Sequence, residues 1–176
     1  MHLSKQTLFA IAVAAAAATA AAIAVAVPAS GTTAADEPPP LVEDYSYPGA
    51  AELLATDHVQ LISGDGHLLY KPCPAAEAPG LIIVRTTDRI GSASNGRLCF
   101  AVVGDTGHLS LKVPNVYAVR GDGTSTAPGH KLKAQLTTDA GTHTTVDVNP
   151  NSDTQVGIGT SPPGDATALL QLDASR

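Results

Sequence analysis

The chain has 176 residues and a formal net charge of −6 at pH 7, and its 10 Lys and Arg residues form no basic run. Nucleic acid and anionic membrane surfaces are therefore disfavoured as partners, since both attract basic proteins. Aromatic residues make up 3% of the chain and Trp is absent, which disfavours surfaces that stack rings on sugars or single-stranded bases.

The first 29 residues have the composition of a secretory signal peptide. Lys5 and the amino terminus are positive, an apolar Ala-rich run extends from Thr7 to Val27, and small residues follow it. Cleavage is expected after Ala29, with Ala26 as the alternative. An uncleaved anchor is the other interpretation, because the run is long enough to cross a bilayer. We expect a secreted, extracellular protein that contacts a membrane only if this segment is retained.

Residues 30–47 are expected to form a flexible linker, since they combine acids, small residues and three consecutive prolines. The folded domain is expected at residues 48–176. It begins with one short helix, because Pro48 suits a first helical turn and the Ala, Glu and Leu residues after it favour helix.

Short β-strands are predicted through the rest of the chain, because apolar residues alternate with polar ones and Gly, Pro, Asp and Asn interrupt the runs. No helical pattern of ten residues or more lies between these runs. We therefore predict an all-β fold, an antiparallel β-sandwich of about eight or nine strands. The expected strands are residues 58–62, 67–71, 81–87, 97–103, 108–113, 115–120, 130–138, 143–148 and 167–173.

The two cysteines of the chain, Cys73 and Cys99, both lie in the predicted domain. An even pair in a small exported domain usually forms a disulfide. We predict a Cys73–Cys99 bond that ties the hairpin of the first two strands to the body of the sandwich. Two separate free thiols are the alternative.

A similar phrase occurs twice, as GDGHLLYKP at residues 64–72 and as GDTGHLSLKVP at residues 104–114. Asp65 with His67, or Asp105 with His108, has the chemistry of a metal ligand pair or of a base and its orienting carboxylate. Asp-Gly sequences are also common hairpin loops, in which the Asp side chain bonds the backbone. Because both phrases lead into alternating strands, we interpret them as hairpin turns.

Metal ligands are the next possibility. The five histidines of the domain all lie near predicted strand starts, but they form no H-E-x-x-H or H-x-H motif. Loop oxygens suited to calcium are present without the D-x-[DN]-x-[DN]-G pattern. We therefore assign no metal site. The residues considered are His58, His67, His108, His130, His143, Asp105, Asp122, Asn149, Asn151 and Asp153.

Motifs for catalysis are equally weak. The chain has no G-x-S-x-G elbow, and a disulfide would leave neither cysteine as a nucleophile. The Gly-rich run VGIGTSPPG at 156–164 lacks the Lys and the helix of a phosphate-binding loop. The tripeptide RGD at 120–122 precedes a turn and is interpreted as a chance occurrence. We assign no catalytic or cofactor-binding residues and expect no cofactor and no enzymatic activity.

Several stretches resemble a group of small secreted proteins of high-GC Gram-positive bacteria that have no assigned function. They are YPGAAELL, SGDGHLL, LCFAVVGDTGHLSLKVPNVYAVRGDG, TTVDV and ATALLQLDAS, which together span most of the predicted mature chain. The most specific part is Cys-Phe followed by a Gly-containing turn and the pattern L-x-L-x-V-P-x-V-Y-x-V-R-G-D. The resemblance implies secretion and a compact β domain, and it brings no catalytic residues with it.

These observations favour a secreted, non-catalytic β-sandwich module that binds an extracellular protein, a glycan or a surface. One alternative is a secreted inhibitor of an extracellular protease, with the long loop RGDGTSTAPGH at 120–130 as its reactive segment. A metal-assisted enzyme is the other alternative.

Overall fold

The computed structural model describes residues 45–76 and 79–176. The expected signal peptide, residues 1–29, and the expected linker up to residue 44 lie outside these described residues. In the described part of the chain, we find no helix that is long and apolar enough to cross a membrane.

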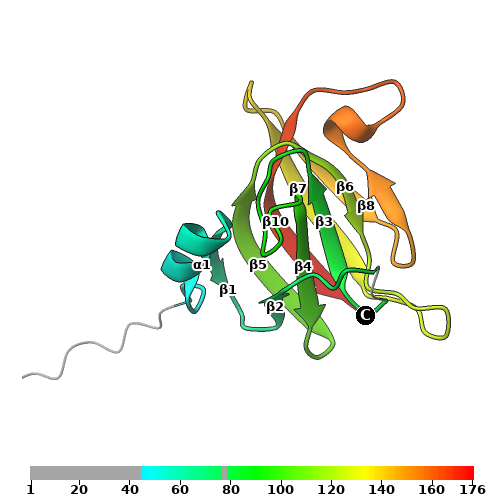
Figure 1. Ribbon diagram of the computed structural model, residues 1–176. Coiled ribbons are helices and arrows are strands. Elements are labelled where there is room, and N and C mark those ends of the chain that lie inside the picture. The colour runs from blue at the N-terminus through cyan, green and yellow to red at the C-terminus, as the bar shows by residue number, and fades with distance from the viewer. Residues whose placement is uncertain (1–44, 77–78) are drawn as a thin grey trace, which may run out of the picture. The chain divides into compact units, whose positions relative to one another are not determined.

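The described residues form two five-stranded antiparallel sheets packed as a β-sandwich (Figure 1), which confirms the predicted fold class. Sheet A has the strand order β1-β5-β10-β7-β8, and sheet B has the order β2-β4-β3-β6-β9. The strands are β1 (Gln60–Gly64), β2 (Leu68–Lys71), β3 (Ile82–Thr86), β4 (Arg97–Val102), β5 (Thr106–Val113), β6 (Val116–Arg120), β7 (Lys131–Thr138), β8 (His143–Val148), β9 (Asp153–Gln155) and β10 (Thr167–Ser175). One α-helix, α1 (Ala50–Thr56), and one 3-10 turn, η1 (Gly157–Gly159), are also present among these residues.

Alternation along the strands builds the core, as the sequence pattern predicts. In β7, Leu132, Ala134 and Leu136 are buried between the sheets, whereas Lys131 and Lys133 are exposed. Successive side chains of a strand point to opposite faces, so one face of sheet A packs inward and the other meets water. Phe100 on β4 is the largest fully buried side chain.

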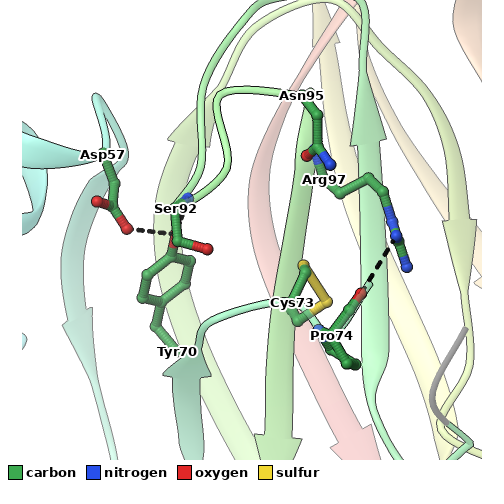
Figure 2. The surroundings of a disulfide bond; sticks show 8 residues. Asp57, Tyr70, Cys73, Pro74, Ser92, Asn95 and Arg97 are labelled. Atoms are coloured by element: carbon green, nitrogen blue, oxygen red, sulfur yellow. Dashed lines mark hydrogen bonds between the residues drawn. A yellow bond between two sulfur atoms is a disulfide. The ribbon is translucent and has the colours of Figure 1, made fainter. Parts of the chain in front are cut away.

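Sheet B is covered on its outer face as well. Ile83 on β3 and Cys99 on β4 are 0% exposed, yet neither belongs to the core cluster between the sheets. The segment that follows β2 crosses this face, and the predicted disulfide between Cys73 and Cys99 fixes it there (Figure 2). The Nη1 atom of Arg97 donates to the carbonyl oxygen of Pro74 at 3.4 Å, which holds the same segment a second time.

The predicted hairpin of the first two strands is wrong. β1 belongs to sheet A and pairs with β5, whereas β2 belongs to sheet B and pairs with β4. The disulfide therefore fastens the connection between β2 and β3 to the outer face of sheet B, and no hairpin is involved. The sequence pattern does not distinguish these arrangements, because alternation places a side chain inward or outward without saying in which of two sheets its strand lies.

Two further differences concern short segments. β9 has only three residues, Asp153–Gln155, two of them exposed, so it carries no apolar signal. Residues 45–47, expected as the end of the linker, are hydrogen-bonded to the edge of β1: the Tyr47 backbone N–H donates to the Ile62 carbonyl, and the Gly64 N–H donates to the Tyr45 carbonyl.

Candidate binding surface at the crossing end

Four connections between the sheets lie at one end of the sandwich, which we name the crossing end. They are residues 65–67 between β1 and β2, 103–105 between β4 and β5, 121–130 between β6 and β7, and 149–152 between β8 and β9. The pairing of the strands brings these connections together, and the carboxyl terminus lies beside them (Figure 1). Connections at one end of a sandwich are the usual place for a binding surface.

The two similar phrases of the sequence meet at this end. Asp65 accepts the backbone N–H of His67 on Oδ1 and that of His108 on Oδ2, both at 2.9 Å. The Asp65 N–H donates in return to the carbonyl oxygen of His108 at 3.2 Å, and the Val103 N–H donates to that of His67 at 2.8 Å. The repeated Gly-Asp phrase therefore marks two adjacent crossings between the sheets, joined by one carboxylate, and not two hairpins.

These contacts stabilise the ionised form of the Asp65 carboxyl group. Partial burial alone would raise the pKa of its carboxyl group, but the hydrogen bonds from the His67 and His108 backbones, with a smaller contribution from the two imidazoles, lower it below the ordinary value of 3.8. The carboxylate is therefore a structural clamp between the first two connections.

His130 links the second connection to the third. Its side chain is 9% exposed, and its Nδ1 lies 2.6 Å from Oδ2 of Asp122, whose side chain is 10% exposed. Its Nε2 lies 3.0 Å from the carbonyl oxygen of Gly104, and its backbone N–H donates to Oδ1 of Asp122 at 2.8 Å. Both ring nitrogens therefore lie within hydrogen-bonding distance of an acceptor oxygen, one on a carboxylate and one on a backbone carbonyl.

The third connection packs backbone to backbone against the fourth. The Gly123 N–H donates to the carbonyl oxygen of Pro150 at 2.7 Å, and the Gly129 N–H donates to Oδ1 of Asn151 at 3.3 Å. A Cβ atom on Gly121 or Gly129 would overlap the Pro150 carbonyl oxygen. Glycine is needed at these positions because two backbones approach too closely for any side chain.

The tip of the loop at 121–130 projects from this fixed base. Residues 125–128 are exposed, while Gly121, Gly123 and His130 are buried. Within the tip, the Thr124 N–H donates to the Ala127 carbonyl at 2.9 Å, and the Ala127 N–H donates to the Thr124 hydroxyl at 3.0 Å. The tip is thus a closed turn held at both ends.

Cavities lie beside this loop. One of about 560 Å³ is lined by Pro79, Arg120, Gly123, Thr124, Ser125 and Asn151. Another of about 390 Å³ lies over the ends of β7, β8 and β10, where Lys133 bonds Asp147 at 2.6 Å. Neither lining contains an aromatic ring.

The structure pairs Asp122 with His130 but, in the part of the chain that it describes, gathers no larger group of the residues considered as metal ligands. His67 lies near Asp65, His108 bonds Asp173 at 2.7 Å, and His130 bonds Asp122, so each of these imidazoles has a different carboxylate. In residues 45–76 and 79–176, no group of three or more His, Cys, Asp or Glu side chains has the arrangement of a metal site.

Sequence reasoning missed the pairing of Asp122 with His130. As metal ligands, Asp122 and His130 are considered separately, and His130 is expected near the start of a strand. The available signal was their position on either side of a loop rich in Gly and small residues, because such a loop brings its own ends together.

Comparison with known proteins adds no family: neither a protein-family model nor a curated protein matches the sequence. The surface described above therefore has to be interpreted from its own geometry.

Proposed function

We propose that the protein is a secreted, non-catalytic β-sandwich module that binds an extracellular protein through the crossing end. One observation carries this proposal: the loop at 121–130 has a base clamped by the buried Asp122–His130 pair and a tip exposed at residues 125–128. The pair holds the base of the loop in place while the tip stays accessible to a partner.

The clamped base orders the loop before a partner binds. Ordering a mobile loop on binding costs conformational entropy, and a loop that is already ordered avoids much of that cost. Hydrogen bonds between successive connections, through Asp65, His130 and Asn151, make the crossing end one connected platform. A protein is favoured over a glycan as the ligand because no ring lines either cavity beside the loop.

Secretion is part of the proposal. The apolar segment within residues 1–29 supports export, with retention as an anchor as the alternative, and the Cys73–Cys99 disulfide fits an oxidising compartment. The resemblance to small secreted bacterial proteins points the same way.

The protease-inhibitor alternative would use the same loop. An inhibitory segment that occupies a protease cleft as a substrate does must offer an extended backbone, as in strand addition. The turn closed between Thr124 and Ala127 supports this alternative less well than it supports recognition by a partner's surface. Equimolar titration against a panel of secreted proteases tests it, and slow-release inhibition with the loop uncut would favour it over our proposal.

The test of the proposal uses the mature chain as bait against the secreted and wall fractions of the producing organism. A Ser125→Arg, Thr126→Arg variant changes the exposed tip, and a Thr145→Arg variant changes an exposed position on β8 as the matched control. We expect a saturable partner whose capture falls at least tenfold with the tip variant and is unchanged with the control. Equal capture by all three proteins would refute the proposed surface.

A further inference from the structure

The few aromatic side chains of the chain are concentrated at one corner. Three of its 4 tyrosines, Tyr45, Tyr47 and Tyr70, lie where β1 and β2 form neighbouring edges of the two sheets. Tyr45 is 61% exposed, and the Tyr70 ring lies edge-on to Phe100 with 5.8 Å between the ring centroids. In a protein this poor in aromatic residues, such a gathering is a distinct surface, which we name the aromatic corner.

Internal hydrogen bonds fix the Tyr47 and Tyr70 side chains of the corner. The Tyr47 hydroxyl accepts the backbone N–H of Tyr70 at 2.7 Å. The Tyr70 hydroxyl donates to Oδ2 of Asp57 at 2.7 Å and accepts the backbone N–H of Ser92 at 3.1 Å. Burial, followed by the hydrogen bond and charge of Asp57, raises the pKa of Tyr70 well above its usual value. The Tyr70 hydroxyl is engaged within the protein as donor and acceptor, whereas the Tyr47 hydroxyl accepts one bond and can still donate its O–H. The corner therefore offers a ligand ring faces and one hydroxyl donor.

One of these bonds occupies part of the β2 edge. β2 is an edge strand of sheet B, and an edge normally offers free backbone N–H groups to an incoming strand. At Tyr70 that N–H is already bound by the Tyr47 hydroxyl. A peptide at this edge therefore has to bind without a complete β-ladder. A polyproline II segment meets that condition, since it makes no backbone ladder and docks on aromatic-lined grooves.

A pocket of about 250 Å³ opens between these rings. Its side chains are those of Tyr47, Pro48, Leu69, Tyr70 and Lys71, and two glycines leave the rest of its wall open. Lys71 is exposed and is the one charged residue of this lining. An apolar floor with a single ammonium group at its rim is complementary to apolar rings followed by a carboxylate.

We propose that the aromatic corner binds a proline-rich segment of another secreted protein in the polyproline II conformation, with an acidic residue of that segment at Lys71. The proline rings of the ligand pack on Tyr47 and Tyr70, because proline has no backbone N–H that would need a hydrogen-bond partner there. The pocket adjoins the crossing end at Gly66 but shares no residue with the loop at 121–130 or with the two cavities beside it, so the tip variant tests the proposed function separately.

The test is a titration of the isotope-labelled mature protein, with Pro38, Pro39 and Pro40 changed to Ala so that the chain's own prolines cannot compete. The ligand is a synthetic peptide of three consecutive prolines followed by Leu and Glu. We expect saturable shifts of backbone signals confined to residues 45–48 and 64–71, with a dissociation constant on the order of 10⁻⁴ M, since the buried area is small. A peptide with the prolines replaced by alanine keeps the length and charge and should bind at least tenfold more weakly.

Two variants locate the contact. Lys71→Glu reverses an exposed charge, leaves the rings in place, and should weaken binding about three- to tenfold. Lys112→Glu makes the same change at an exposed position of β5 and should leave binding unchanged. The proposal is overturned if no saturable shifts occur up to millimolar peptide, if the shifts lie elsewhere, or if the alanine peptide binds equally well. Equal weakening by both variants would overturn the role of Lys71.

Discussion

The disulfide across sheet B gives a prediction whose size follows from the structure. Cys73 and Cys99 are 26 residues apart in sequence, and their Cα atoms are 5.3 Å apart. We expect the Cys73→Ala, Cys99→Val variant to fold, because valine fills the buried site on β4 and suits a strand. It should be much less stable than the parent, because its unfolded chain regains the freedom that the bond removes.

The chain-entropy relation for a closed loop of this length gives about 3.5 kcal/mol at 25 °C. A folded domain of roughly 130 residues unfolds with an entropy of about 270 cal/mol/K, so this loss corresponds to a fall in Tm of about 13 °C. The unfolded variant also exposes more surface than the cross-linked chain, so its urea m-value should rise.

The assay is urea and thermal unfolding of parent and variant, followed by far-UV circular dichroism, with and without reductant. Reductant applied to the unfolded parent should reproduce the variant's lower stability, and reductant should have no effect on the variant. A Tm fall of less than about 3 °C, with an unchanged m-value, would show that the outer-face segment contributes little constraint and would refute this reasoning.

Three further predictions concern the crossing end. His130→Ala removes the imidazole partner of a buried carboxylate, which keeps the backbone N–H of residue 130, and should lower stability by about 1.5–3 kcal/mol in urea unfolding. His108→Ala, at a more exposed pair, should cost no more than about 1 kcal/mol, and equal losses would contradict the buried clamp. The folded-state pKa of Asp65 lies below 3.8, so its stabilisation exists above that pH and is lost as the pH falls through the folded-state value. Asp65→Asn should therefore be less stable than the parent at pH 7, and a difference that persists undiminished at pH 2 would argue against the ionised clamp. Gly121→Ala should cost about 1–3 kcal/mol, because its Cβ overlaps the Pro150 carbonyl oxygen, and hydrogen exchange should report loosening of residues 121–130; unaltered exchange would mean that the loop does not need this close approach.

The strands were predictable from the sequence because alternation is a local property. The run at 143–148 was expected as a strand and is β8, and the run at 130–138 differs from β7 by one residue at its start. Cys73 and Cys99 were paired correctly because the chain offers no other cysteine. Each of these inferences uses information contained within a few neighbouring residues or in a simple count.

The candidate site was less predictable. Asp65, His67 and His108 were singled out because their phrase is repeated, but their shared role required knowing that β1 pairs with β5 while β2 pairs with β4. The role of His130 depends on Asp122 and on Gly104, which reach it from different connections. Asp122 flanks the same loop as His130, whereas the contact with Gly104 is set by sheet topology, which sequence spacing does not encode.

The sequence by itself determined the class of the fold, the position of most strands and the single disulfide, because propensity, alternation and cysteine number act locally. Only the tertiary structure decided which strands share a sheet, that the repeated Gly-Asp phrase crosses between sheets, and that an Asp–His pair is buried beneath an exposed loop. The physical reason is that each strand satisfies half of its backbone hydrogen bonds and one apolar face with partners distant in sequence. The surfaces proposed for binding exist where those distant choices bring connections and sheet edges together.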